Sequence, residues 1–165
     1  MGLMIVCPWC STRQVLRNSF LFFDSNEFEE IIMYYLDTGN IALAKKAGKL
    51  AFEQYPSSIS LNLIIAEISI VENNLKKAEK INNKLHQLEP LNAEILFQKS
   101  KILSKKKKHL ESIESLKKIE KNSDLFYDSL YTIGKEYLFI DDFKNAKDTF
   151  INCLKINRND LLVIN

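Results

Sequence analysis

The sequence is poor in the residues that interrupt helices. Only four Gly and three Pro occur in 165 residues. A turn-rich β fold uses more of both, because Gly supplies positive φ angles and Pro fixes turns. Long helices are therefore favoured. No apolar run reaches the roughly 18 residues that a membrane-spanning helix needs, so we expect no contact with the interior of a membrane.

Cysteine is also scarce. The three Cys residues are an odd number and do not make a disulfide framework, so the cytoplasm is the expected location. Cys7 and Cys10 are two residues apart, as in a redox couple or half of a zinc site. The third Cys and both His residues are far away in sequence and fall in expected helices. We interpret the pair as a chance occurrence in the N-terminal leader, residues 1–24, and leave any role for it open. The leader is expected to be poorly ordered or to form a partial capping helix.

The sequence lacks the motifs of common enzymes. It contains no phosphate-binding glycine loop, no nucleophile elbow and no HExxH zinc motif. His86 and His109 stand alone within expected helices, where a structural role is the usual one. We therefore expect no enzyme activity, no cofactor and no metal site.

The charge is small in total but unevenly placed. A net charge of +2 excludes a chain that binds nucleic acid over its whole surface. Residues 99–125, however, hold nine Lys and four acidic residues, including the run Lys105 to Lys108. This run is either a solvated turn between helices or a contact for an acidic protein or nucleic acid.

A period of 34 residues runs through most of the chain. Small residues recur at this interval: Ala44, Ala78, Ser112 and Ala146. Pro56 and Pro90 keep the same spacing. Counted from Ser25, the period divides the chain into four units, residues 25–58, 59–92, 93–126 and 127–160. A fixed period of this size is typical of stacked helix pairs.

Each unit carries the pattern of two amphipathic helices. Apolar residues at positions 4, 7, 8 and 11 of a unit form one stripe on a first helix. A second stripe follows around the small residue at position 20. The pattern predicts eight helices, over residues 25–37, 41–54, 58–71, 75–88, 92–104, 109–121, 125–138 and 142–156.

The pattern resembles the tetratricopeptide repeat (TPR). The fourth unit matches it best, through Leu130, Ile133, Gly134, Tyr137, Ala146 and Phe150. The first unit follows closely, whereas the second and third are degenerate and no Trp marks any unit. The resemblance implies an all-α fold, a right-handed α-solenoid of antiparallel helix pairs over about residues 25–158. The alternative is an ordinary helical bundle with small residues at equal intervals.

The resemblance also implies a function and a binding surface. TPR arrays are non-catalytic scaffolds that bind a peptide or helix in a concave groove, lined by positions 2, 5, 9 and 12 of the first helices. Carried onto this chain, the groove residues are Glu29, Met33, Leu36, Leu63, Glu67, Ile70, Phe97, Lys101, Tyr131, Lys135 and Leu138. Leu63, Ile70 and Leu138 have the alternative of being buried between neighbouring units. Position 9 changes from Met33 and Glu67 to two lysines, so the groove is expected to be polarised.

The partner expected from this resemblance is a protein or peptide. One alternative is a nucleic-acid-associated helical repeat that uses the basic third unit, and another is a structural segment of a larger assembly. Residues 159–165 look like the start of a further first helix, which suggests a fragment of a longer, bacterial-type TPR protein. Phe150, Cys153 and Leu154 would then be partly uncovered, and we expect self-association through this C-terminal end.

Overall fold

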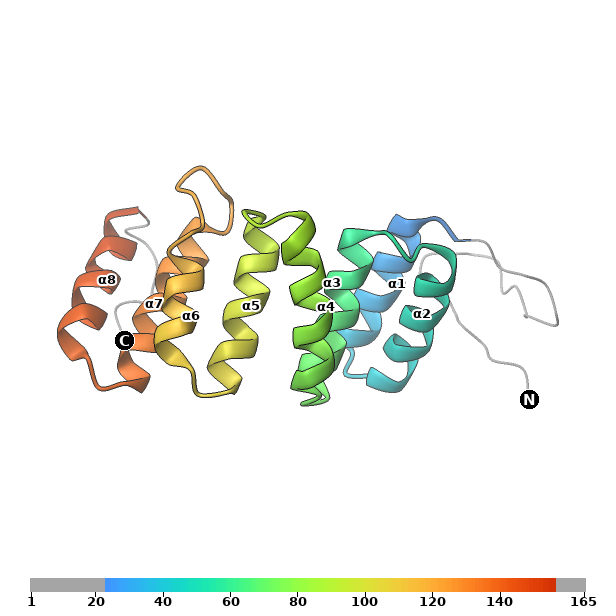
Figure 1. Ribbon diagram of the computed structural model, residues 1–165, viewed down its shortest axis with the longest axis horizontal. Coiled ribbons are helices and arrows are strands. Elements are labelled where there is room, and N and C mark those ends of the chain that lie inside the picture. The colour runs from blue at the N-terminus through green and yellow to red at the C-terminus, as the bar shows by residue number, and fades with distance from the viewer. Residues whose placement is uncertain (1–22, 157–165) are drawn as a thin grey trace. The chain divides into compact units, whose positions relative to one another are not determined.

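The computed structural model describes residues 23–156, which form eight α-helices and contain no strand (Figure 1). The helices are α1 (Ser25–Asp37), α2 (Ile41–Gln54), α3 (Ile59–Val71), α4 (Leu75–Leu88), α5 (Ala93–Lys105), α6 (His109–Leu116), α7 (Phe126–Phe139) and α8 (Phe143–Ile156). All but α6 begin and end within one residue of the predicted ranges. The predicted leader, apart from Phe23 and Asp24, and the predicted helix start at 159–165 lie outside the described residues.

Short polar residues start most of the helices. The side chain at the N-cap accepts a hydrogen bond from a backbone N–H of the first turn at six helices, with Asp24, Asn40, Ser58, Asn74, Asn92 and Asp142 as the caps. Asp24 forms a full capping box, because the Glu27 carboxylate also accepts from the Asp24 backbone N–H. These caps satisfy amide groups that a helix start leaves without a partner.

The turn inside each helix pair repeats as well. Position 15 of all four units has a positive φ angle, near 60–70°, and is occupied by Gly39, Asn73, Lys107 and Asp141. Gly, Asn and Asp tolerate this left-handed conformation better than other residues do. Lys107 is the exception, and it shows that the run Lys105 to Lys108 lies at this turn. The backbone therefore follows the 34-residue period even where the side chain departs from it.

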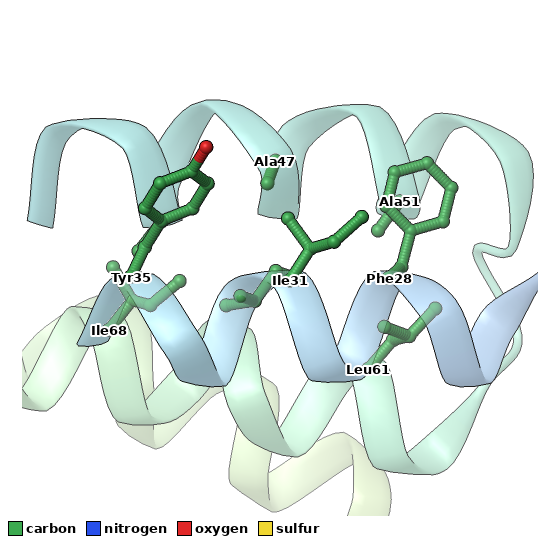
Figure 2. Close-up of a cluster of buried hydrophobic side chains, with 9 residues drawn as sticks. Phe28, Ile31, Tyr35, Ala47, Ala51, Leu61 and Ile68 are labelled. Carbon is green, nitrogen blue, oxygen red and sulfur yellow. The ribbon is translucent and has the colours of Figure 1, made fainter. Parts of the chain in front are cut away.

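The contacts divide the chain into two compact parts, an N-terminal part and a C-terminal part, with the boundary after Glu72. The N-terminal part packs α1 against α2 and α3. Phe28 and Leu61 are fully buried in its core (Figure 2), and so is Ile32. The Phe28 ring meets Phe23 and Tyr55 edge-on, with centroids 5.4 and 6.3 Å apart. Such edge contacts add to the free energy gained by burying the rings.

The C-terminal part, from Asn73 onward, packs α4 to α8. Consecutive helices lie side by side from α4 to α8, and α7 and α8 form the most extensive contact (Figure 1). A cluster of five buried residues joins α5, α6 and α7, and it consists of Leu96, Ile113, Leu116, Ile119 and Ile133. Two Ser hydroxyls on α6 extend this packing: Ser112 donates to the Ser100 carbonyl at 3.1 Å, and Ser115 donates to the Leu96 carbonyl at 3.0 Å.

Helix α6 is shorter than predicted. It ends at Leu116, five residues before the expected end, and a long loop leads to α7 (Figure 1). The chain tightens there, because the Ile119 N–H bonds to the Leu116 carbonyl three residues back at 3.0 Å. This i,i+3 bonding ends the α-helix and still turns Ile119 into the core, where it is 4% exposed. The apolar stripe was predicted correctly, but the helix that carries it was not.

The small residue at position 20 is enclosed in every unit. Ala44, Ala78 and Ser112 are fully buried, and Ala146 is 1% exposed. A larger side chain at these places would hold the packed helices apart, since ridge-into-groove packing brings helix axes to about 8–10 Å. The 34-residue period of small residues is therefore a packing requirement.

Two glycines in helix interiors give a matched test of this packing. At Gly134, an added Cβ would lie 2.6 Å from the Phe150 ring, so we expect Gly134→Ala to lower the free energy of unfolding by about 1–3 kcal/mol. At Gly48, the same Cβ would meet Ile68 at an ordinary 3.4 Å. Gly48→Ala should therefore raise the free energy of unfolding by about 0.5–1 kcal/mol, because Ala is the better helix former.

Urea unfolding of the two variants measures both effects. The opposite signs are the diagnostic result. Equal effects of the two substitutions would contradict the close approach of Phe150 to α7.

Candidate functional site

The predicted groove residues of the N-terminal part differ in exposure. Met33 on α1 is 45% exposed, whereas Leu36 is half-buried and packs against the core cluster. Glu29 is half-buried and accepts a short hydrogen bond from the Ser60 hydroxyl on α3. Glu29 and Met33 thus present a carboxylate and a thioether, neither of which attracts an anion.

Helix α3 contributes less accessible side chains. Leu63 is 8% exposed and Ile70 is 2% exposed, so both follow the packing alternative that the sequence left open for them. Glu67 is half-buried. The accessible part of the predicted surface on the N-terminal part is therefore mainly Met33, with the half-buried Glu29, Leu36 and Glu67.

The predicted groove residues of the C-terminal part form two matching pairs. On α5, the Lys101 ammonium lies 5.8 Å from the centre of the Phe97 ring. On α7, Lys135 lies 5.7 Å from the Tyr131 ring. Each pair is four residues apart on one helix, and the second pair is 34 residues after the first. Both lysines are exposed and both rings are half-buried, which is the geometry of a cation–π contact.

The two rings are anchored in the protein. Phe97 packs against the buried cluster of α5, α6 and α7, and the Tyr131 ring lies 5.8 Å from Phe150 of α8. Leu138, at the far end of α7, is 44% exposed, so it is not buried between neighbouring units as the alternative prediction had it. Helices α5 and α7 therefore each present an anchored ring beside an ammonium group, and α7 adds the exposed Leu138.

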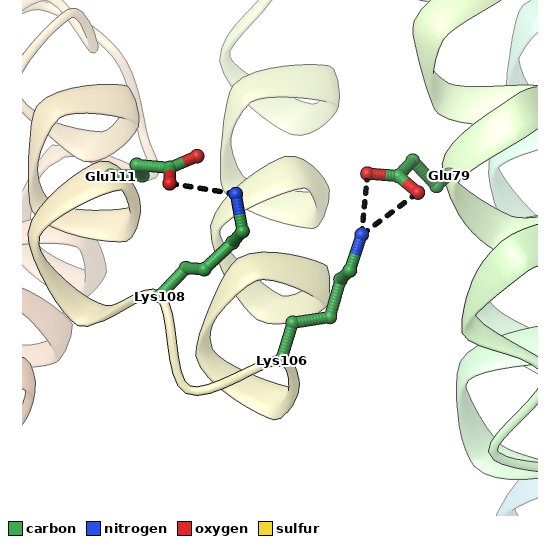
Figure 3. A network of polar contacts seen from close by, with 4 residues as sticks. All are labelled: Glu79, Lys106, Lys108 and Glu111. Atoms are coloured by element: carbon green, nitrogen blue, oxygen red, sulfur yellow. Dashed lines mark hydrogen bonds and ion pairs between the residues drawn. The ribbon is translucent and has the colours of Figure 1, made fainter.

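The lysine run between α5 and α6 is partly neutralised. Lys106 pairs with Glu79 of α4 at 2.9 Å, and Lys108 pairs with Glu111 at 2.8 Å (Figure 3). The hydrogen bond and charge of Glu111 raise the pKa of Lys108 above its ordinary value. All four lysines are exposed, but Lys106 and Lys108 are engaged in local ion pairs.

Reasoning from the sequence missed one polar pair. The Glu136 carboxylate on α7 is 3% exposed and lies 2.7 Å from His109 Nδ1 on α6. The His109 ring also stacks on Phe139, with centroids 5.2 Å apart. The structural role expected for His109 agrees with these contacts. Its partner could not be predicted, because the sequence pattern of one helix contains no information about the neighbouring helix. The feature that could have indicated this pair is its spacing of 27 residues, which two other polar pairs of the chain share.

Other side chains with chemical potential do not form a site. In residues 23–156, no group of three or more His, Cys, Asp and Glu residues is placed to hold a metal ion. Cys153 is fully buried, which corrects the expectation that it is partly uncovered at the C-terminal end. Cys7 and Cys10 lie outside the described residues. None of the described helices is both long and apolar enough to cross a bilayer.

The comparison with protein families identifies the repeat. A family model described as "Tetratricopeptide repeat" matches residues 127–160, the bounds predicted for the fourth unit. The chain contains a tetratricopeptide repeat and has the fold of TPR proteins. No curated protein matches it in sequence. The degenerate second and third units are recognised by their structure instead.

Solved structures of TPR proteins share the fold. PilF of Pseudomonas aeruginosa is 24% identical with a TM-score of 0.74, over 84% of this chain and 64% of its own length. A thermophilic TPR protein of Thermus thermophilus is 15% identical with a TM-score of 0.74, over 85% of this chain and 77% of its own. YrrB, a TPR protein with an unusual peptide-binding site, is 14% identical with a TM-score of 0.67, over 85% and 72%. This chain thus spans less than two thirds of PilF.

These findings establish an all-α solenoid of helix pairs. TPR arrays present repeated helix faces to other proteins and are typically non-catalytic. In this array, the face of α5 and α7 combines anchored aromatic rings with exposed cations.

The burial of His86 on α4 gives a testable pH dependence. Burial, together with the charges of Lys99 and Lys118, lowers the pKa of His86 below its ordinary value. Its Nδ1 is buried and has no hydrogen-bond partner. Because the unfolded chain takes up this proton at a higher pH than the folded chain does, stability is full above the unfolded pKa of about 6.5 and falls as the pH is lowered through it.

We expect the melting temperature to drop more between pH 7.5 and 5.5 in the original chain than in His86→Gln. Carboxylates titrate mainly below this window, and His109 is unchanged in both proteins. An equal drop in both would show that His86 keeps its ordinary pKa in the folded chain.

Proposed function

We propose that the chain binds a peptide along the exposed faces of its first helices, and that the face of α5 and α7 selects acidic residues. The observation that carries the proposal is the repeated pair of a half-buried ring and an exposed lysine, Phe97 with Lys101 and Tyr131 with Lys135. Two equal pairs on successive first helices suit two acidic side chains of one partner.

The physics of the pairs supports this chemistry. Holding an ammonium group beside a ring restricts its motion, so less side-chain entropy is lost when a carboxylate binds. The exposed edges of the rings offer apolar area next to the charge, and aromatic residues are common anchors in peptide and protein recognition. Leu138, exposed at the end of α7, extends the apolar part of this face.

The N-terminal part carries other side chains at the same positions. Met33 and Glu67 hold the position of the two lysines, and Glu29 and Leu63 hold the position of the two rings. Carboxylates at these positions would repel an acidic segment. This distribution does not support a clamp for a C-terminal carboxylate at Glu29 and Met33. It supports a partner that is acidic where it meets α5 and α7.

Nucleic acid is the second candidate, since the third unit is rich in lysine. Its support is weaker, because Lys106 and Lys108 are committed to Glu79 and Glu111. A backbone of phosphates would need several uncommitted cations in a row. We propose that the run forms the turn between α5 and α6 and plays no part in specificity. A cytoplasmic scaffold without enzyme activity is the role that we propose.

The proposal predicts a selective effect of charge reversal. Peptides selected from a random library on the full chain should be enriched in Asp and Glu. Lys101→Glu combined with Lys135→Glu should weaken their binding at least tenfold, measured by fluorescence anisotropy at about 0.15 M salt, because attraction becomes repulsion. The matched control is Lys84→Glu with Lys144→Glu, which changes the net charge equally on α4 and α8 and should leave affinity within about twofold.

A second pair of variants tests the rings. Phe97→Ala and Tyr131→Ala should each cost about 2 kcal/mol of binding free energy if the rings are anchors. Circular dichroism must show that each variant remains folded, because both rings also pack inside the protein. Unchanged affinity in folded ring variants, or selected peptides without an acidic bias, would rule the proposal out. RNA or DNA binding that is lost on Lys105→Ala with Lys107→Ala would favour the nucleic-acid candidate.

A further inference from the structure

Side chains 27 residues apart join each second helix to the first helix that follows it. Lys45 of α2 pairs with Glu72, just after α3, at 2.7 Å. Glu79 of α4 pairs with Lys106, just after α5, at 2.9 Å (Figure 3). Both pairs link position 21 of one unit to position 14 of the next, with the charges exchanged. The same contact is therefore made twice with opposite polarity.

The third junction uses the same two positions with apolar residues. Position 21 is Ile113, which is 3% exposed, and position 14 is Ile140, which packs against the buried cluster that contains Ile113. Across all three junctions, then, positions 21 and 14 carry side chains of matching chemistry. A lysine opposite Lys106 would place two like charges together, and a charge opposite Ile140 would be buried without a partner, so either change would destabilise the junction.

Positions 17 and 10 carry a second pair of side chains of matching chemistry at each junction. Ile41 packs against the cluster that contains Ile68, and Leu75 and Ile102 hold the same places at the next junction. At the third junction the pair is His109 with Glu136, 2.7 Å apart. Each junction thus has one apolar and one polar pair. At the first two junctions the polar pair is at positions 21 and 14. At the third junction those positions hold Ile113 and Ile140, and the polar pair is at positions 17 and 10.

Helix α8 presents these positions without a following first helix in the described part of the chain. Phe143, at position 17, is 65% exposed, whereas Ile41, Leu75 and His109 are all half-buried at that position. Lys147, at position 21, is exposed as well. An aromatic residue followed by a lysine repeats the chemistry of Ile41 and Lys45, the junction whose partners are Ile68 and Glu72.

We propose that this face of α8 is a docking surface for the first helix of another tetratricopeptide unit, one that carries an apolar residue at its position 10 and a carboxylate at its position 14. The carboxylate would pair with Lys147 and the apolar residue would cover Phe143. Helix α1 of a second copy fits less well, because its positions 10 and 14 are Tyr34 and Thr38, neither of which is an acid. The proposal is independent of the peptide face on α5 and α7.

The chain itself supplies matched probes for a test. In the first fusion, the full chain is followed directly by a second copy of residues 64–92. Residues 161–165 then supply positions 1–5 of a fifth unit. The added Ile68 and Glu72 fall at its positions 10 and 14. In the second fusion, residues 98–126 are added instead, which places Ile102 and Lys106 there. The two fusions differ in the sign of the charge that meets Lys147.

Thermal unfolding should show a reversal between the fusions. Lys147→Glu should lower the melting temperature of the first fusion and raise that of the second, by about 1–3 °C each, as expected for one exposed ion pair in a protein of this size. In the chain without an added unit, the substitution should change the melting temperature by less than about 1 °C. Phe143→Ala should cost roughly 4 °C or more in the first fusion and little in the unextended chain, where the ring is exposed.

Three outcomes would overturn the proposal. The first is a Lys147→Glu effect of the same sign in both fusions. The second is an added unit that gives no gain in helical circular dichroism in either fusion. The third is a concentration-dependent dimer of the unextended chain that Phe143→Ala abolishes in sedimentation experiments, because it would assign this surface to a second copy.

Discussion

The structure depends on the close approach of helices at one small residue in every 34. The side chain at this position is at most 1% exposed in every unit, as Ala44, Ala78, Ser112 and Ala146. With these places filled by side chains no larger than Ser, the surrounding apolar residues of the helices reach each other and exclude water. A large residue at any of them would separate helices over their whole length, since protein interiors have few voids to absorb extra volume.

Once the helices pack at this interval, equal positions of successive units face equal surroundings. This periodicity puts Phe97 and Tyr131, and Lys101 and Lys135, in matching places on α5 and α7. It also brings side chains 27 residues apart together at the junctions. The two kinds of surface have different chemistry. Lysines lie beside aromatic rings on the first helices α5 and α7, whereas paired side chains lie at the junctions, so the proposed peptide face and the contacts between repeats occupy different parts of the repeat.

Much of this arrangement could be predicted from the sequence because it depends on local features. Helix periodicity, polar caps such as Asn40 and Asn74, and turn residues such as Gly39 gave seven helices to within one residue. The end of α6 could not be predicted, since Leu116 and Ile119 keep the helical spacing and only the three-residue hydrogen bonding distinguishes the loop. The burial of Leu63 and the pairing of His109 with Glu136 depend on packing between helices, which one helix's pattern does not contain.

The account is tested most directly by locating a bound peptide on the protein. Hydrogen exchange measured by mass spectrometry, with and without a selected acidic peptide on the full chain, reports which helices the partner covers. The account predicts slower exchange along α5 and α7 around Lys101 and Lys135, with α6 and α8 unchanged. Slower exchange confined to α6 and α8, or to the turn at Lys105 to Lys108, would contradict it.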